Sequence, residues 1–496
     1  MGTMNFLLTN SASPEAAREM ARGYVVGAPD YMPWPTEIQV DNGQVVVRRP
    51  VDDSGCICLP WQVPAHGLML LSTATLIERP IPYLMGVELA RGRVNILRNQ
   101  AADWQMGGLS LGPELENRIQ KSSIAFAQAV CRQDAASEAG ELADTAIQQA
   151  IDAGQDLVQS YVDQVFTTRQ QRQGRLSTAW TVGLNGPVPN AEQTALLKKT
   201  FNCVRIPLPW GEIESTEGSY TWDRIDALMH WAKSNELPII AGPLIDFSTH
   251  GVPSWLEKWN GDLQSLANFL YDYVETALRR YNSQIRIWQI TAGSNCASIL
   301  SLGEDRLLWL TLQLLEMARQ VDNELHLIVG IAQPWGEYLA WEERTYSPFV
   351  FADTLLRSKA QISCLDLELV MGITSRGSYL RDTLEISRLL DLYALLGLPL
   401  RVTLGSPSAN SADPLAPDYE IQARGAGPEW SPDLQAAWAR QVGALAACKP
   451  FVEGVSWAHW TDAEPHIFPH TGLLDAANAP KPALAELELV REQHLV

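Results

Sequence analysis

The strongest constraint on the fold is a regular alternation of strand-like and helix-like segments from Leu176 to the end of the chain. Eight short runs rich in β-branched and aromatic residues are typical of buried strands. They cover residues 178–184, 203–208, 238–245, 285–291, 326–332, 364–371, 400–404 and 454–460. The helical patterns between them include residues 190–199, 225–234, 263–280, 306–321, 378–396 and 432–447. This alternation predicts an α/β fold, a (β/α)8 TIM barrel. A doubly wound sheet is the alternative, but a Gly-rich phosphate loop does not follow the first strand.

The first 95 residues have a different character. Short strand-like runs at 37–40, 44–48 and 67–73 are separated by Pro, Gly and Asp turns, which predicts a small β-sandwich-like domain. Such a domain is either a carbohydrate-binding module or a structural cap. Its aromatic residues Tyr31, Trp34 and Trp61 fit core positions as well as sugar-facing ones.

A helical stretch connects this domain to the barrel. Pro113 suits a first helical position, and Ala, Gln, Asp and Glu dominate the residues that follow. Two helices at about 113–134 and 138–170 would form an α-helical hairpin. Their apolar stripe must pack on the barrel or on a second copy of the chain, so a homo-oligomer through the hairpin is one expectation. We therefore divide the chain into residues 1–95, 96–175 and 176–496.

The charge balance limits the partners. The chain has 37 basic and 57 acidic residues, a formal net charge of −20, and is an acidic protein. Nucleic acids and anionic membranes need a cationic face, so neither is expected as a partner. The sequence contains no apolar run long enough to span a membrane and no recognisable signal peptide. Seven scattered cysteines favour neither a disulfide scaffold nor a zinc site, so we expect a cytoplasmic protein without metal or cofactor.

Four motifs in the barrel resemble glycoside hydrolase family 10, the xylanase family, and the resemblance covers residues 178–490. They are similar to the family's "FN…GxFxF" stretch, its "QxPxW" segment, its "RY…WDVVNE" strand 4 and its "GVTFWGxTD…PKPAY" ending. The corresponding segments are residues 197–226, 251–256, 280–288 and 454–482. Their order and spacing carry the resemblance, which implies a xylanase-like barrel.

The resemblance also implies where catalytic groups would lie. In that family one Glu donates a proton to the leaving oxygen and a second Glu attacks the anomeric carbon, with their carboxyl groups roughly 5–5.5 Å apart. The acid position falls on Gly293, directly after Ala292, and the nucleophile position falls on Leu404. Both catalytic Glu positions are therefore substituted, although the reaction needs both carboxyl groups.

Other polar positions of the family are substituted too. The Glu-Asn pair and Lys of strand 2 fall on Arg205-Ile206 and Pro209, and the Gln and His of strand 6 fall on Glu368 and Val370. The resemblance thus implies a carbohydrate-active architecture without the groups that cleave sugars. Our main hypothesis is a pseudoenzyme whose barrel mouth binds a glycan, such as a polysaccharide or oligosaccharide, or another protein.

Two alternatives remain open, so the sequence does not decide whether the chain is an enzyme. The first is an active O-glycosyl hydrolase of the endo-β-glycanase type that uses relocated carboxylates. The principal candidates are Glu368, Asp462 and Asp246, and further acids near strand ends are Glu212, Glu304, Glu337 and Glu464. The second alternative is an oligomeric structural scaffold with an inert barrel.

Several residues are candidates for ligand contact. Trp255, Trp335 and Trp460 lie in loops or at strand ends, where a sugar ring can stack on an aromatic face. Arg205 would bind either an acidic sugar or an internal carboxylate such as Asp246.

His459 and Glu464 belong to the polar segment 457–470, which also contains Asp462. The segment suits acid–base chemistry, turn capping or metal binding, but its spacing matches no common metal-ligand pattern. On the sixth strand, Asp366 and Glu368 must point the same way, into the barrel or toward the helices. A buried acid pair needs a partner, which the sequence does not identify.

Overall fold

The structure is a computed structural model. It describes residues 2–9, 13–27, 32–248, 251–297, 299–358 and 360–496. Tyr31, one of the aromatic candidates, lies outside these ranges. Trp34 and Trp61 are both half-buried, and Trp61 Nε1 donates to Asp144 at 3.4 Å.

Eight parallel strands close into a barrel, which confirms the predicted fold. Each strand pairs with the next along the chain, β11 pairs directly with β13, and β19 pairs with β9. The strands are β9 (Ala179–Gly183), β10 (Cys203–Ile206), β11 (Ile239–Ala241), β13 (Ile287–Ala292), β14 (His326–Ile331), β15 (Cys364–Val370), β17 (Leu400–Gly405) and β19 (Val452–Trp457). The two-residue strand β12 (Ile245–Asp246) adds to the carboxyl end of β13.

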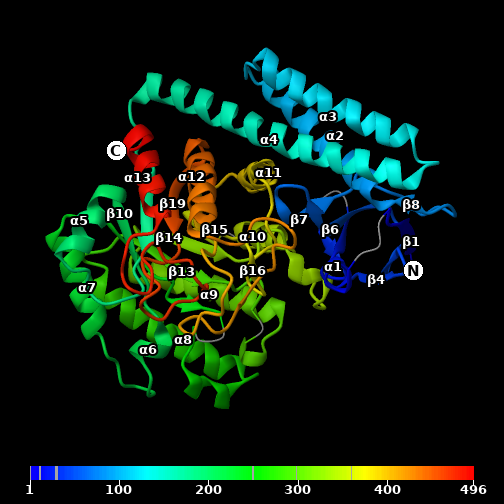
Figure 1. The fold of residues 1–496 in the computed structure, drawn as a ribbon. Coiled ribbons are helices and arrows are strands. Elements are labelled where there is room, and N and C mark those ends of the chain that lie inside the picture. The colour runs from blue at the N-terminus through cyan, green and yellow to red at the C-terminus, as the bar shows by residue number, and fades with distance from the viewer. Residues whose placement is uncertain (1, 10–12, 28–31, 249–250, 298, 359) are drawn as a thin grey trace.

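Helices surround the barrel and follow the predicted pattern, with α10 as an additional helix (Figure 1). They are α5 (Ala191–Thr200), α6 (Trp210–Ile213), α7 (Asp223–Ser234), α8 (Leu263–Tyr281), α9 (Glu304–Val321), α10 (Pro348–Arg357), α11 (Thr383–Ala394), α12 (Pro432–Cys448) and α13 (Pro482–His494). Short 3-10 turns lie in the loops as η1 (Ser254–Trp259), η2 (Ile299–Ser301) and η3 (Glu337–Ala340).

The N-terminal residues form two four-stranded sheets. One has the order β4 (Glu37–Asp41), β5 (Gln44–Arg49), β1 (Gly2–Leu7), β8 (Tyr83–Leu84). The other has the order β3 (Pro33–Trp34), β2 (Tyr24–Gly27), β6 (Gly55–Val63), β7 (Gly67–Ser72), and α1 (Pro14–Met20) precedes β2. Phe6 and Val47 from one sheet and Val25 and Leu59 from the other belong to one buried cluster, so the arrangement is sandwich-like.

Three helices lie across the top of the molecule in Figure 1: α2 (Met85–Met106), α3 (Pro113–Cys131) and α4 (Ala136–Gln173). The expected hairpin corresponds to α3 and α4. Helix α2 begins at Met85, within the stretch expected to be β-rich, and this part of the expectation was wrong. The buried apolar residues Val87, Ala90, Val94, Leu97 and Ala101 recur at spacings of three and four, which is the periodicity of a helix.

Helix α4 packs on both parts of the molecule. Ile147 and Ile151 join the buried cluster of the sheets, while Leu157, Val162 and Phe166 join that of the barrel. The apolar stripe is therefore covered within the same chain.

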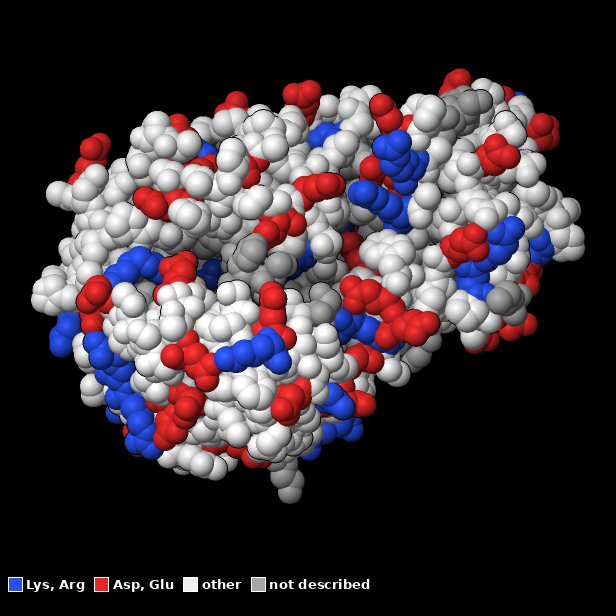
Figure 2. Space-filling view, turned by 90° about the horizontal axis from the view of Figure 1, so that it is seen from below, with Lys and Arg blue, Asp and Glu red and all other residues white. Residues whose placement is uncertain are grey.

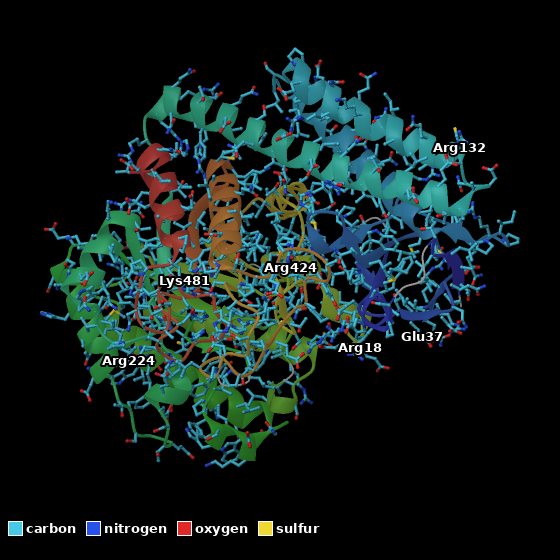
Figure 3. All side chains as sticks on the ribbon, in the orientation of Figure 1. Arg18, Glu37, Arg132, Arg224, Arg424 and Lys481 are labelled. Carbon is cyan, nitrogen blue, oxygen red and sulfur yellow. The ribbon has the colours of Figure 1, made fainter. Side chains whose placement is uncertain are left out.

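Loops of the barrel also bond directly to strand β7. The amide of Leu68 donates to the carbonyl of Arg424 at 2.9 Å, and the amide of Leu70 donates to that of Leu380 at 3.0 Å. In the opposite direction, the Arg424 guanidinium donates a hydrogen bond to the carbonyl of His66 at 2.6 Å. Figure 3 shows Arg424 near the middle of the molecule, where barrel and sheets meet.

The surface charges are mixed. On the face drawn in Figure 2, basic side chains are interspersed with acidic ones. Across the described ranges, we find no helix whose length and apolar character would let it cross a bilayer.

Candidate functional site

A cavity of about 400 Å³ lies at the carboxyl ends of the barrel strands, and we call it the mouth. This is the end of a TIM barrel at which catalytic and binding residues usually gather, and the volume is typical of small-molecule sites. Charged side chains that line it include Arg205, Asp246, Asp366, Glu368 and Arg376. The mouth is therefore polar at its base although the barrel wall is apolar.

Arg376 connects two of the predicted carboxylates. It lies in the loop after β15 and donates to both oxygens of Glu368, at 2.8 and 2.9 Å. The same guanidinium donates to Asp246 Oδ1 at 2.8 Å. Asp246 and Glu368, which are far apart in sequence, thus share one cation in the mouth.

A second ion pair lies deeper in the barrel. The Arg205 guanidinium donates to Thr403 Oγ1 at 3.0 Å and lies 3.6 Å from Asp366 Oδ2, while the Thr403 hydroxyl contacts both oxygens of Asp366. Asp366 and Glu368 therefore both point into the barrel, and each has an arginine partner. The internal carboxylate that pairs with Arg205 is Asp366 and not the expected Asp246.

Burial and charge act in opposite directions on these groups. Burial disfavours the charge of Arg376, but Asp246 and Glu368 outweigh it and hold its pKa well above the usual value. Burial raises the pKa of Glu368, and Arg376 opposes this effect. For Arg205 burial dominates and lowers the pKa, with Asp366 acting in the opposite sense.

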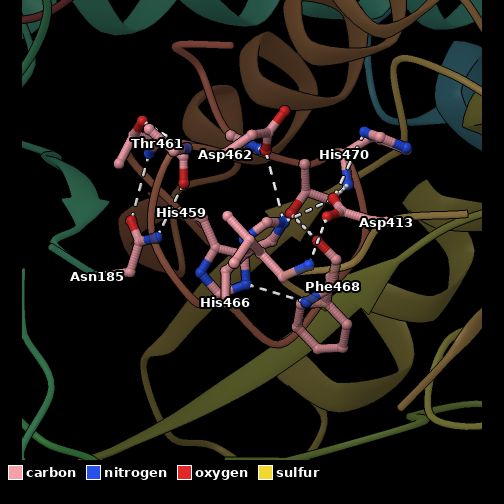
Figure 4. A network of polar contacts seen from close by, with 12 residues as sticks. Asn185, Asp413, His459, Thr461, Asp462, His466, Phe468 and His470 are labelled. Atoms are coloured by element: carbon pink, nitrogen blue, oxygen red, sulfur yellow. Dashed lines mark hydrogen bonds and ion pairs between the residues drawn. The ribbon is translucent and has the colours of Figure 1, made fainter. Parts of the chain in front are cut away.

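His459 also lines the mouth, as a ligand-binding candidate should. Its Nε2 accepts a hydrogen bond from the amide of Phe468 at 3.2 Å (Figure 4). Burial, reinforced by nearby cations including Arg205 and Arg376, lowers the pKa of His459 well below its ordinary value. The ring is thus neutral near pH 7, and with Nε2 as acceptor its proton resides on Nδ1.

Asp462 stands apart from the mouth in a buried network behind it (Figure 4). One oxygen accepts the Gly472 amide at 2.6 Å, and the other accepts the ammonium of Lys481, which also donates to Ser408 Oγ at 2.8 Å. Each Asp462 oxygen thus accepts a hydrogen bond from another loop, and Asp462 holds these loops together outside the lining of the mouth.

Two groups of side chains have the composition of metal ligands. One consists of Asp413, Asp462 and His466, of which His466 also lines the mouth. The other consists of His326, Cys364 and Glu453 at the opposite end of the barrel. In the first group Asp462 already pairs with Lys481. In the second group Glu453 pairs with His326 at 3.0 Å and lies 3.6 Å from Arg401. Internal cations therefore already neutralise carboxylates of both groups.

Of the two positions expected to correspond to the catalytic pair, one faces the mouth and the other is buried in the wall of the barrel. Gly293 lines the mouth with φ of +70°, and a Cβ there would lie 3.7 Å from Arg376 Nη2. Leu404 is fully buried in the apolar cluster shared with Leu400 and Val402, whereas its neighbour Thr403 faces the mouth. Because side chains alternate along a strand, a carboxylate at position 404 would face the helices. The expectation that position 404 would present a nucleophile to the mouth therefore does not fit the direction of this side chain.

The three tryptophan candidates lie outside the lining of the mouth. Trp255 packs edge-on against Trp210 and donates to the carbonyl of Glu214 at 2.8 Å. The Arg381 guanidinium lies 4.4 Å from the ring centroid of Trp335, in a separate cavity beside α2 and α11. Trp460 is 4% exposed and belongs to the barrel core.

Among the remaining carboxylate candidates, the side chains of Glu304, Glu337 and Glu212 have structural partners. Glu464 lies outside the mouth lining, and its carbonyl oxygen is 2.8 Å from His466 Nδ1. Glu304 accepts the amides of Thr345 and Tyr346. Glu337 is buried against Arg381. Glu212 and Arg224 both line the mouth and pair with each other at 2.9 Å; Figure 3 labels Arg224 at the lower left of the molecule.

Sequence reasoning missed Arg376. It lies in a loop that matches none of the family motifs. Its position eight residues after Glu368, in the connection that follows the same strand, could have indicated that the two side chains meet. A search of the mouth loops for a cation able to neutralise Asp366 and Glu368 would have found it.

The closed barrel with a polar cavity at the carboxyl ends of its strands defines a TIM-barrel protein. A model of glycosyl hydrolase family 10 matches residues 166–292, which end with strand β13 and make up less than half of the chain. The barrel is thus glycosyl hydrolase family 10-like.

Individual relatives are distant. The endo-beta-1,4-xylanase Xyn10C of Cellvibrio japonicus is 24% identical over 97 residues, which span 19% of this chain and only 16% of that protein. Among solved structures, xylanase 10B from Thermotoga maritima is 14% identical with a TM-score of 0.47, covering 67% of this chain and 97% of that chain. Native xylanase10C from Cellvibrio japonicus is 16% identical with a TM-score of 0.48, and the match covers 65% of this chain and 72% of that chain.

Proposed function

We propose that the barrel is a pseudoenzyme whose mouth binds a saccharide without hydrolysing it. The observation that carries the proposal is the position of Arg376, which holds Glu368 and Asp246 in one ion-paired group. A retaining glycosidase needs one carboxyl that can donate a proton and a second that is free to attack. Here both oxygens of Glu368 and Oδ1 of Asp246 already accept hydrogen bonds from Arg376.

The loss of family positions supports the same conclusion. Position 293 is a glycine, and Thr403, the neighbour of position 404 that faces the mouth, carries no carboxyl group. Catalytic carboxylates act as a unit, so losing both removes a large part of the barrier reduction.

The shape of the mouth suits a sugar ring. Its walls combine apolar residues such as Leu244 and Ile331 with the polar side chains of Asn185, Gln289 and His459. Such a mixture is typical of small-molecule sites, in which a few polar groups set orientation. The relatives are named as xylanases, so β-1,4-linked xylo-oligosaccharides are the first ligands to test.

Calorimetric titration with xylobiose, alongside a reducing-sugar assay on xylan, tests the proposal. We expect saturable binding and no sugar release. The Leu415→Trp variant should obstruct the mouth, since Leu415 lines it and is 37% exposed. Leu489→Trp on α13 is the matched control, because Leu489 is equally exposed and distant from the mouth. Binding that is absent, or unaffected by Leu415→Trp, would refute the proposal.

One observation favours the second candidate, a hydrolase with relocated carboxylates. Asp246 and Glu368 lie together in the mouth, and burial raises the pKa of Glu368, as in a general acid. That candidate predicts sugar release from xylan or another β-glucan and its loss in Glu368→Gln. Asp462 is a weaker relocated candidate, since Lys481 and Gly472 occupy its oxygens.

A scaffold role, binding of a protein in the mouth, oligomerisation through the helices and a cytoplasmic location remain predictions. Size-exclusion chromatography with light scattering measures the oligomeric state directly.

A further inference from the structure

The mouth continues into a second hollow. This hollow has a volume of about 660 Å³ and shares Ser248, Gly293, Arg376 and Asp418 with the mouth. The two spaces therefore meet above the Arg376 ion pair. A ligand longer than one or two sugar rings would extend from the mouth into this hollow.

The N-terminal part of the chain contributes to the second hollow and to the support of its wall. Arg22, which lies between α1 and β2, lines it directly. Tyr24 of β2 packs edge-on against Trp341, with ring centroids 6.3 Å apart and an interplanar angle of 84°. The sheets thus support the wall that the barrel loops present to the hollow.

Aromatic side chains give the hollow its character. Trp341 is 54% exposed, a large exposed fraction for a tryptophan, and lines the hollow together with Tyr338, Tyr379 and Tyr419. Hydroxyl and amide groups of Ser248, Thr374 and Gln333 lie in the same lining. Flat apolar faces beside such groups match a pyranose ring, which has apolar faces and a polar edge.

The charges of the hollow are largely satisfied by the protein itself. Arg376 is held by Glu368 and Asp246, and Arg22 lies 3.8 Å from Glu19. The acids Glu337 and Glu342 pair with Arg381 and Arg344. Within the described part of the chain, both arginines of the lining therefore already have acidic partners, and this favours an uncharged ligand.

We infer that the second hollow is an additional subsite for a neutral β-linked oligosaccharide, with Trp341 as its stacking platform and the N-terminal sheets as its support. This inference rests on saccharide binding in the mouth, as proposed above. It gives the N-terminal part a role in determining the length of ligand that the barrel retains.

The test compares xylobiose and xylohexaose by calorimetric titration of the full chain. Wild type should bind the hexaose about tenfold more tightly than the biose, a gain of the size expected from one additional aromatic contact. Trp341→Ala should remove most of this gain and leave xylobiose affinity unchanged. Trp309→Ala is the control, because Trp309 is also exposed, at 39%, but lies on α9 outside the hollow.

A second pair of variants tests the N-terminal contribution. Arg22→Gln should weaken hexaose binding and not biose binding, whereas Arg18→Gln, an exposed position on α1 outside the lining, should change neither. The inference is overturned when biose binds but hexaose binds no better, or when Trp341→Ala keeps the full gain. Failure of both sugars to bind would overturn the proposed function together with this inference.

Discussion

Arg376 determines what the two acids of the mouth can do. Its side chain is 7% exposed, and those of Asp246 and Glu368 are 13% and 14% exposed, so water screens the ion pairs poorly. A buried ion pair of this kind adds little net stability compared with apolar packing, but loss of one partner leaves an uncompensated charge. The guanidinium thus stabilises the mouth and keeps its carboxylates occupied.

We predict that Arg376→Met destabilises the protein by about 3–5 kcal/mol, because two buried carboxylates lose their counter-ion. Arg224→Met on the rim should cost only about 0–1 kcal/mol, since Arg224 is 34% exposed and pairs with the exposed Glu212. Urea unfolding of the two variants and wild type gives both values. Similar losses in the two variants would contradict the prediction.

His459 should make stability depend on pH. Its pKa is lowered in the folded state, whereas the unfolded chain takes up a proton at about pH 6.5. The contribution of His459 is therefore fully present above about pH 6.5 and is lost as the pH falls below that value. Urea midpoints measured from about pH 7.5 to 5 should fall less steeply in His459→Gln than in wild type.

The matched control for this measurement is His230→Gln, because His230 is exposed on α7. Its pH profile should follow that of wild type. Equal slopes for His459→Gln and wild type would show that His459 does not govern this range.

At the level of elements, α4 has a special position because its 38 residues contact both buried clusters. Its inner face consists of small and branched residues, among them Ala143, Ala146, Ile147 and Ala150, all fully buried. Small side chains allow the helix to approach the sheets and the barrel closely, so the packing is sensitive to changes in volume.

Ile147→Ala should therefore destabilise the protein by about 2–5 kcal/mol through the cavity it leaves. Ile124→Ala on α3 makes the same chemical change at a side chain that is 49% exposed, and should stay within about 0.5 kcal/mol of wild type. Chemical denaturation measures both. A small effect at Ile147 would mean that α4 is not held by this face.

Helices and strands were predictable from the sequence where the residue pattern within the segment itself was clear. The eight barrel strands follow from runs of β-branched residues such as those around Ile290 and Val329, and Pro113 marks the start of α3. Helix α2 carried a helical period from Val87 to Ala101 that strand-like neighbours obscured. The direction of Leu404 was missed because a motif fixes a position along the chain, whereas the strand register fixes which face a side chain occupies.

At the scale of the whole molecule, an ion pair and a cation–π contact connect the N-terminal helices to the helices of the barrel. Arg93 of α2 pairs with Asp382 at 2.8 Å, and Lys449 at the end of α12 pairs with Asp391 while its ammonium lies 4.7 Å from the ring centroid of Tyr161 on α4. Such long-range contacts explain why the site was only partly predictable. Asp246 and Glu368 were identifiable as acids near strand ends, but the Arg376 that joins them is 130 positions from Asp246 along the chain.

We expect the sheets, the helices and the barrel to unfold in one cooperative transition, since α4 belongs to both buried clusters. Thermal unfolding followed by far-ultraviolet circular dichroism and by tryptophan fluorescence should give coincident curves. Two separated transitions, or a calorimetric enthalpy above the van't Hoff value, would show instead that the parts melt independently.

Under the proposed function, in which the mouth binds sugars without cleaving them, the single guanidinium shared by Asp246 and Glu368 also restricts how such a chain can evolve toward sugar cleavage. Replacing Arg376 alone leaves two acids repelling each other in a poorly hydrated space, and adding an acid at position 293 alone directs it at a guanidinium from a strained backbone. Each first step carries a penalty that only a second, simultaneous change removes. A lineage with this mouth would therefore need at least two coupled substitutions, and not one, to reach hydrolysis.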